Sequence, residues 1–323
     1  MISTFQIPTN IQEDINLVEN LMLTQADNYH QDLKSALKVL LSSGGKRIRP
    51  VIILLIGDML RGDKTILLNL ATAIELLHTA TLVHDDLIDG ALLRRGIPTL
   101  NSKWSPAATV LTGDFLFSCS AVLAAKTDNL EVIELFSRTL TVIVNGEINQ
   151  LFTSRCNTSR EDYESRIYAK TASLFETSAK SAAILSNADE DQIENLRKFG
   201  YSLGMAFQII DDVLDYVGDE SKVGKPLGGD LRQGLITLPV LYYIQDHLDN
   251  PSIIRLLEGK CITEDEEITS LVKDIAVSDA IGKSLNDAHD LVLQAQSCLV
   301  SFPECQEKQT LLALTEYIIE RNK

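Results

Sequence analysis

The stretch from residue 78 to residue 95, HTATLVHDDLIDGALLRR, decides how the rest of the chain is interpreted. Its three aspartates, Asp85, Asp86 and Asp89, follow an apolar run that favours a helix. Residues three or four apart lie on the same side of a helix, so the three carboxylates share one face. Like charges this close repel each other, and a divalent cation would relieve the repulsion. Mg²⁺ usually takes one or two protein carboxylates and completes its shell with water and phosphate oxygens.

Two arginines, Arg94 and Arg95, follow the aspartates, and their forked cations suit phosphate groups. The stretch therefore indicates a metal-bridged diphosphate site, although an acidic triplet on a helix is more often a solvated face. The apolar surroundings of the triplet favour the metal interpretation. So does its recurrence, at the same spacing, as Asp211, Asp212 and Asp215 in FQIIDDVLDYVGD.

Composition sets the broad class of the protein. The chain has 323 residues, of which 45% are hydrophobic and 23% charged, enough for one large core or for two domains. The net charge of −16 and the absence of a lysine and arginine stripe argue against nucleic-acid binding as the main task. An acidic protein that binds an anionic substrate needs metal ions and a few placed cations to reverse its field locally.

Cysteine usage and the apolar segments point to a soluble cytoplasmic protein. The chain has five cysteines and no CxxC pair, which predicts buried or idle thiols in a reducing compartment: Cys119, Cys156, Cys261, Cys298 and Cys305. The first residues show no signal peptide, because no basic segment precedes an apolar run. The longest apolar stretch, 65–83, carries Glu75 and His78, so we expect a buried helix and no transmembrane segment.

Apolar residues recur about every 3.6 positions, with little strict alternation, which predicts helices throughout. We expect helices at 11–24, 28–42, 48–59, 64–89, 104–125, 129–154, 160–186, 189–217 and 229–246, with several more towards the C-terminus. Several are apolar on more than one face, as in the middle of a bundle. With no βαβ rhythm and no repeat, the simplest fold is a single all-α domain over residues 1–323.

Other polar residues in apolar settings are weaker signals. The joint SGGKRIRP at 43–50 places Lys46, Arg47 and Arg49 just before an apolar helix, as an anion site or as a solvated basic turn. Asp114, in an apolar run, is interpreted as a satisfied core carboxylate in preference to an indirect site residue.

Three further residues fall near the two acidic helices. His78 lies seven residues before Asp85 and points to the same side of the helix, which favours a ligand contact over a structural role. Lys170, next to Thr171, is weak evidence alone because a long lysine stem often reaches out to solvent. The glycine-rich segment after the second acidic helix, 218–229, suits a flap over a charged ligand and a plain surface loop equally.

Five motifs, in order, resemble those of the trans-isoprenyl diphosphate synthases: GGKRIRP, HDDLID followed by RRG, KTASLF, GMAFQIIDDVLD, and GKPLGGD. The resemblance runs from about residue 43 to residue 240. It implies a helical bundle around a deep central cavity, normally in a homodimer, with the two aspartate-rich helices facing each other and holding three Mg²⁺ ions. In that family an allylic diphosphate ionises and isopentenyl diphosphate is added head-to-tail.

The resemblance also implies a role for each motif residue. Asp85 and Asp89 would bind two of the metal ions and Asp211 the third, with Asp86, Asp212 and Asp215 completing the motifs. Arg94, Lys170 and Lys225 would hold the allylic diphosphate, and Lys46, Arg49, His78 and Arg95 the isopentenyl diphosphate. Thr171 and Gln208 would face the developing carbocation. The departing diphosphate accepts the proton in this family, so no protein base is expected.

The residues before Asp85 would then form the wall that limits product length. Ala80 and Thr81 are small, and Leu77 and Ile74 lie further along roughly the same side of the helix. From Ala71 to Asp85 a helix rises about 21 Å, enough for several isoprene units. We therefore expect a linear product of C20 or longer, while the primer and the exact length stay open.

Two other interpretations remain. A class I terpene cyclase would share the all-α fold and the first aspartate motif, but it would not need a second DDxxD motif or paired arginines. A non-catalytic partner subunit of a heteromeric synthase would usually have lost motif aspartates or arginines, and none is lost here.

Overall fold

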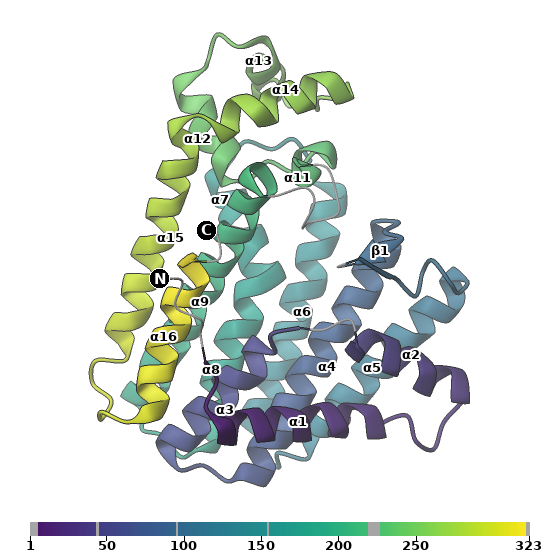
Figure 1. Cartoon of the computed structure of the whole chain (residues 1–323), viewed down its shortest axis with the longest axis vertical. Coiled ribbons are helices and arrows are strands. Elements are labelled where there is room, and N and C mark those ends of the chain that lie inside the picture. The colour runs from purple at the N-terminus through teal and green to yellow at the C-terminus, as the bar shows by residue number, and fades with distance from the viewer. Residues whose placement is uncertain (1–5, 43–44, 95, 154, 219–226, 321–323) are drawn as a thin grey trace.

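The apolar helices of the sequence pack side by side around one another in a bundle (Figure 1). A computed structural model describes residues 6–42, 45–94, 96–153, 155–218 and 227–320. Its helices are α1 (Thr9–Thr24), α2 (Gln31–Ser42), α3 (Ile48–Leu60), α4 (Lys64–Ile88), α5 (Pro106–Ala125), α6 (Leu130–Phe152), α7 (Arg160–Ile167), η1 (Tyr168–Ala172), α8 (Ser173–Leu185), α9 (Glu190–Val217), α11 (Gly229–Arg232), α12 (Leu238–Asp246), α13 (Pro251–Leu257), α14 (Asp265–Ala276), α15 (Asp279–Cys298) and α16 (Gln306–Glu320).

Most of the long helices begin where a capping residue stands. The Asp63 side chain accepts hydrogen bonds from the backbone N–H groups at the start of α4. Ser105 caps α5, with Pro106 at the first helical position as the sequence predicts. Asp189 and Gln192 form a capping box at the start of α9. Local sequence therefore determines where the two aspartate-bearing helices, α4 and α9, begin.

Helix α4 lies in the interior of the bundle and packs against α1, α3, α5 and α8. Thirteen of its residues are buried, among them Ala73, Ile74 and Leu77 with no exposed surface. By length and composition alone α4 and α5 are each apolar enough to cross a membrane, but 67% of the apolar window of α4 is buried inside the fold. The prediction of a buried helix over 65–83 is confirmed.

Two predicted helices differ from the observed ones. The helix predicted over 229–246 is wrong, because α11 ends at Arg232 and α12 begins only at Leu238. Gly234 adopts a positive φ of 76° between them, and Pro239 restarts the helix in its first turn. The helix predicted over 160–186 is continuous, but it widens into the π-helical turn η1 at Tyr168–Ala172.

A short hairpin, β1 (Leu93–Arg94) and β2 (Ile97–Pro98), follows α4. Nothing in the pattern of the sequence predicts it, because two residues are too few to show alternation.

The expectation of five idle thiols is wrong for two of them. Cys156 and Cys261, which are 105 residues apart in sequence, form a disulfide. It joins the segment before α7 to the segment before α14, beside the turn at Gly234. No spacing rule pairs cysteines this distant, so the sequence alone does not reveal the bond. Cys119, Cys298 and Cys305 are free thiols.

Candidate active site

A cavity of about 820 Å³ opens between the joint before α3 and the helices α4, η1, α8 and α9. Its lining gathers residues from every part of the chain that carries a motif. Basic side chains come from the joint, carboxylates from α4 and α9, and a lysine and a threonine from η1. The lining residues that the sequence singled out are Lys46, Arg49, His78, Thr81, Asp85, Asp86, Arg94, Lys170, Thr171, Gln208 and Asp211.

On α4, the three aspartates have three different environments. Asp85 is half-buried, and burial is the main cause that raises its pKa to about 7, helped by the carboxylates of Glu147 and Asp89. Asp86 is buried and its Oδ1 accepts from Nε of Arg94 at 2.9 Å and from Nη2 at 2.8 Å. Asp89 is exposed at the C-terminal end of the helix.

On α9 the second aspartate is again buried, but the third, Asp215, is half-buried where Asp89 is exposed. Asp212 is buried and accepts from Gln208 Nε2 at 2.8 Å and from the hydroxyl of Tyr163 at 2.7 Å. Asp215 accepts from the backbone N–H groups of Gly229 and Asp230, each at 3.1 Å. Burial and the neighbouring Asp230 raise the pKa of both carboxyls.

Each motif therefore holds its second aspartate with hydrogen bonds from the protein and presents its first aspartate, Asp85 or Asp211, to the cavity. The described residues contain no cluster of three or more side chains that would hold a metal ion alone. That arrangement fits Mg²⁺, which takes few carboxylates and completes its shell from a bound phosphate. The raised pKa of Asp85 fits as well, because crowded carboxyls that bind protons also bind cations.

The cavity also has a basic part, which holds two arginines in different environments. Arg47 is buried, adopts a positive φ of 46°, and pairs with Glu75 at 2.9 Å and with Glu19 at 2.9 Å. Arg49 packs over the ring of Phe175 at 4.7 Å, and its buried Nε makes no hydrogen bond to any described residue. Burial lowers the pKa of Arg49 to about 10.

A buried guanidinium N–H without an acceptor is costly, and a bound anion would satisfy it. The geometry at Arg49 therefore points to an anionic group, with Lys46 at the rim, where its Nζ lies 4.2 Å from the ring of Tyr317. Arg47 lines the same cavity, but its charge is already balanced within the protein.

Lys170 and Thr171, which both line the cavity, lie in the π-helical turn η1. Single π-turns inside α-helices are frequent at functional sites. The carboxylates of Glu147, Asp85 and Asp230 raise the pKa of Lys170 against the opposing effect of burial. Lys170 is thus a cation beside the acidic side of the cavity.

The remaining predicted site residues are placed as follows. Arg95 and Lys225 lie outside the described residues. Of the predicted product-length wall, Thr81 lines the cavity, whereas Ala80, Leu77 and Ile74 are fully buried in the core behind it. The role of all four in product length stays a prediction.

The interpretation of Asp114 as a core carboxylate is wrong, because 58% of its side chain is exposed, with one oxygen 3.7 Å from Nε2 of His84. Helix α5 is apolar on its outer face as well as its inner face, so an apolar neighbourhood in sequence does not mean burial there.

The sequence motifs assign no role in the site to four residues that shape it: Glu147, Tyr163, Phe175 and Phe207. The two phenylalanines line the cavity. Tyr163 reaches Asp212 from α7, and Glu147 acts electrostatically on Asp85 from α6. Glu147 was noticeable as a carboxylate in an apolar helix, but nothing in the sequence indicates that Tyr163 meets Asp212, because the contact spans 49 positions.

The raised pKa of Asp85 predicts how stability depends on pH without metal. A folded-state pKa of about 7, against a usual value of 3.8, means that protonated Asp85 favours the folded state. Its contribution is full below pH 4 and is lost as the pH rises through 7. The side chain of Asp85→Asn does not titrate. In EDTA, the melting temperature of this variant minus that of the wild type should therefore be about 2 °C larger at pH 8 than at pH 5.

Excess Mg²⁺ should remove most of this pH dependence from the wild type and leave Asp85→Asn unchanged. Asp114→Asn is the matched control, since it removes an exposed carboxylate from another helix. Equal dependence of the melting temperature on pH for the wild type and Asp85→Asn in EDTA would show that the pKa of Asp85 is not raised in the folded protein.

Comparison with known proteins agrees with this geometry. The family model for polyprenyl synthetase matches residues 30–275, more than half of the chain. The chain is 35% identical to heptaprenyl diphosphate synthase component 2 of Bacillus subtilis, over 96% of this chain and 89% of that protein.

Two solved structures are similar over nearly the full length. The first is a heptaprenyl diphosphate synthase from Staphylococcus aureus, with a TM-score of 0.91, 33% identity, and coverage of 97% of this chain and 99% of that one. The second is a polyprenyl synthase from Caulobacter crescentus complexed with calcium and isoprenyl diphosphate, with a TM-score of 0.89, 32% identity, and coverage of 97% and 96%. With the aspartate-lined cavity, these matches show that the chain belongs to the polyprenyl synthetase family of all-α prenyltransferases.

Proposed function

We propose that the chain condenses isopentenyl diphosphate head-to-tail with an allylic diphosphate and releases a linear polyprenyl diphosphate. The observation that carries the proposal is the shared cavity, which is lined by Asp85 of α4 and Asp211 of α9 and also by the basic residues around Arg49. The acidic side suits a diphosphate held through cations, and the basic side suits a second diphosphate held directly. A cavity with both is what a reaction between two diphosphates requires.

Different residues of the cavity would bind the two diphosphates and the metal ions. Arg94, which pairs with Asp86, and Lys170, which interacts electrostatically with Asp85, would hold the allylic diphosphate. Lys46, Arg49 and His78 would hold the isopentenyl diphosphate at the other side. Mg²⁺, when bound by Asp85, Asp89 and Asp211, would supply Lewis-acid stabilisation of the leaving diphosphate. Three ions per site is the number we propose, and the calcium-bound relative supports the presence of divalent cations in such a cavity.

Neutral oxygens face the place where the allylic cation would form. Thr171 and Gln208 line the cavity and are hydrogen-bonded to each other at 2.6 Å. Neither is a strong nucleophile, so neither would trap a carbocation. Departing diphosphate would accept the proton that ends each addition, and no general base of the protein is assigned.

The central test is product formation by the purified chain. With Mg²⁺, isopentenyl diphosphate and an allylic primer, the wild type should yield a linear prenyl diphosphate. Asp211→Asn keeps the shape of the side chain but removes its charge, so turnover should fall by about 10²-fold or more with folding retained. Radiolabelled product, separated by chromatography after phosphatase treatment, measures the turnover of the wild type and of the variant.

Asp114→Asn is again the matched control and should retain turnover. The same assay separates the alternatives. A cyclic hydrocarbon would indicate a terpene cyclase, and complete absence of product from the pure chain would contradict the proposal. The relative named heptaprenyl diphosphate synthase component 2 favours a second candidate, a subunit active only with another component, and restored activity on adding such a component would reveal it.

We infer that the product is longer than C20, since the similar proteins named above are heptaprenyl and polyprenyl synthases. Thr81 lies on the cavity wall, one turn of α4 before Asp85. Thr81→Phe should therefore place a ring in the path of the growing chain and shift the products to fewer isoprene units. Chromatography of the dephosphorylated products measures the shift, and an unchanged distribution would refute the assignment of the wall.

Ala80 is the informative comparison. Its side chain is fully buried behind the wall, so a ring there displaces core neighbours before it reaches the cavity. Ala80→Phe should lower the melting temperature more than Thr81→Phe and shorten the product less.

A homodimer is part of the proposal. Helices α5 and α6 carry large apolar side chains that are between 40% and 81% exposed: Val110, Leu111, Val122, Val144, Ile148, Leu151 and Phe152. A surface of this kind is typical of an interface, and a two-fold pairing of the chain would bury it on both copies.

Light scattering on the purified chain should give twice the chain mass. Leu111→Glu should shift the population towards monomer, because two-fold symmetry brings the new charge in twice. Leu257→Glu, at a half-exposed apolar position on α13, is the control that should leave the mass unchanged. A monomeric and fully active wild type would contradict the assembly.

A further inference from the structure

Four polar side chains form one continuous hydrogen-bonded chain that leads from the cavity into the core. The Thr171 hydroxyl donates to Gln208 Oε1 at 2.6 Å, and Gln208 Nε2 donates to Asp212 Oδ1 at 2.8 Å. The Tyr163 hydroxyl donates to the other oxygen, Asp212 Oδ2, at 2.7 Å. Thr171 and Gln208 line the cavity, whereas Tyr163 and Asp212 are only 1% and 3% exposed.

The direction of this chain follows from the geometry of its inner end. Gln208 Nε2 lies 2.8 Å from Asp212 Oδ1, and the Tyr163 hydroxyl occupies the other oxygen of Asp212, so the NH₂ of Gln208 is the group that faces Asp212. The carbonyl oxygen of Gln208 then faces Thr171. That oxygen only accepts, so the single hydroxyl hydrogen of Thr171 must point at it.

The consequence reaches the cavity. With its hydrogen committed to Gln208, Thr171 has only oxygen lone pairs left to offer to a ligand. A reversed amide would let the hydroxyl hydrogen turn outward and put positive charge where the allylic cation forms. The inner pair thus determines the sign of the dipole at the reacting carbon, although neither member lines the cavity as Thr171 does.

We propose that Tyr163 is a positioning residue for the prenyl transfer: by holding Asp212, it fixes the amide of Gln208 and thereby directs the lone pairs of Thr171 at the developing carbocation. This inference rests on the proposed function, because it concerns the same allylic cation. Fixed dipoles aimed at developing charge lower a barrier without reorganising during the reaction.

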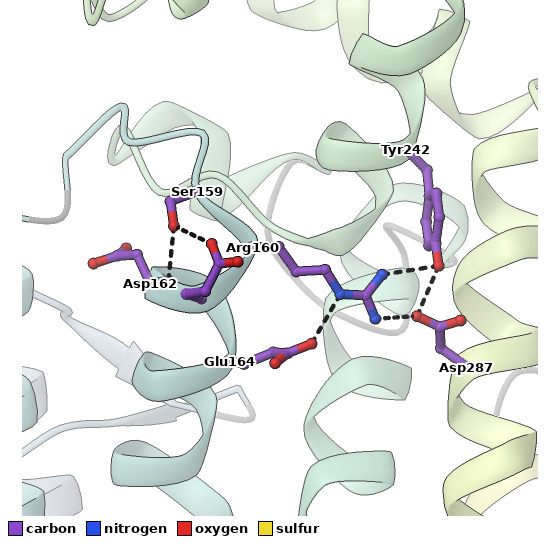
Figure 2. A network of polar contacts seen from close by, with 7 residues as sticks. Ser159, Arg160, Asp162, Glu164, Tyr242 and Asp287 are labelled. Carbon is purple, nitrogen blue, oxygen red and sulfur yellow. Dashed lines mark hydrogen bonds and ion pairs between the residues drawn. The ribbon is translucent and has the colours of Figure 1, made fainter.

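The fold holds Tyr163 from both sides. At the start of α7, Arg160 donates to Glu164, to the hydroxyl of Tyr242 and to Asp287, at 2.8, 3.0 and 2.6 Å (Figure 2). This network ties α7 to α12 and α15. At the other end of the helix, Arg166 donates to the backbone carbonyl of Ile236. Tyr163 therefore has little freedom to move away from Asp212.

The substitution Tyr163→Phe tests this positioning role. Tyr163→Phe removes one hydroxyl and keeps the ring, so packing is preserved while Asp212 loses a donor. Turnover at saturating substrate should fall about tenfold, less than the 10²–10³ lost with a direct contact to the reacting atoms. The KM for isopentenyl diphosphate should stay unchanged, because Tyr163 does not act at the basic side of the cavity.

A double-mutant cycle with Thr171→Val separates positioning from general stabilisation. Valine has the shape of threonine but no hydroxyl, so the four-residue hydrogen-bonded chain has no hydroxyl left to orient. In the Thr171→Val background, adding Tyr163→Phe should change turnover by less than about twofold. Thr171→Ser, which keeps the hydroxyl, should restore the full effect of Tyr163→Phe.

Tyr216→Phe is the matched control. Tyr216 is as buried as Tyr163 and also donates or accepts one hydrogen bond, but its partner is Thr237, outside the chain of four. Its loss should lower the melting temperature without a coupled loss of turnover.

The outcomes are distinct. Equal losses from Tyr163→Phe with threonine and with valine at 171 would overturn the inference and leave the proposed function standing. A wild type that makes no prenyl diphosphate would overturn both. If Tyr163→Phe does not fold, as judged by circular dichroism, Tyr163→Met takes its place in the cycle. It also removes the hydroxyl that holds Asp212 and should likewise lose its effect when residue 171 is valine.

Discussion

The constraint on which the rest of this structure depends is the repulsion among carboxylates that share one cavity. Removing a carboxylate from water is costly unless hydrogen bonds or a cation replace the lost solvation. The chain meets that cost in two ways. Asp86 is held by Arg94, and Asp212 by Gln208 and Tyr163. The first aspartate of each motif lines the cavity, where a bound cation would balance its charge.

The basic side of the cavity follows the same logic with the opposite charge. Arg47 and Arg49 are two positions apart, yet the protein neutralises only the first, through Glu75 and Glu19. Breaking a buried pair of that kind leaves an uncompensated charge, so Arg47 is bound to the fold. Arg49 keeps a buried N–H without an acceptor. Arg47 thus stabilises the joint, whereas Arg49 has a buried N–H that a bound anion would satisfy.

Much of this arrangement was predictable from the sequence, because it depends on local pattern. The period of apolar residues placed α4 and α9, and caps such as Ser105 marked where helices start. The aspartate spacing indicated which carboxylates share a face. The unpredictable part depends on contacts between distant residues. No short stretch of sequence predicts the disulfide between Cys156 and Cys261 or the hydrogen bond from Tyr163 to Asp212. The π-helical turn at Lys170 is local, but the sequence pattern does not distinguish it from an α-helix.

The misinterpretation of Asp114 is informative about the assembly. Helix α5 is apolar on nearly all sides, which in an isolated chain predicts complete burial. Its inner face packs on α4, yet its outer face is exposed, with Leu111 66% and Val122 55% accessible. Large apolar side chains gathered on an exposed face typically mark an interaction surface. Because α5 packs directly on α4, a partner that covered the outer face of α5 would lie one helix away from Asp85.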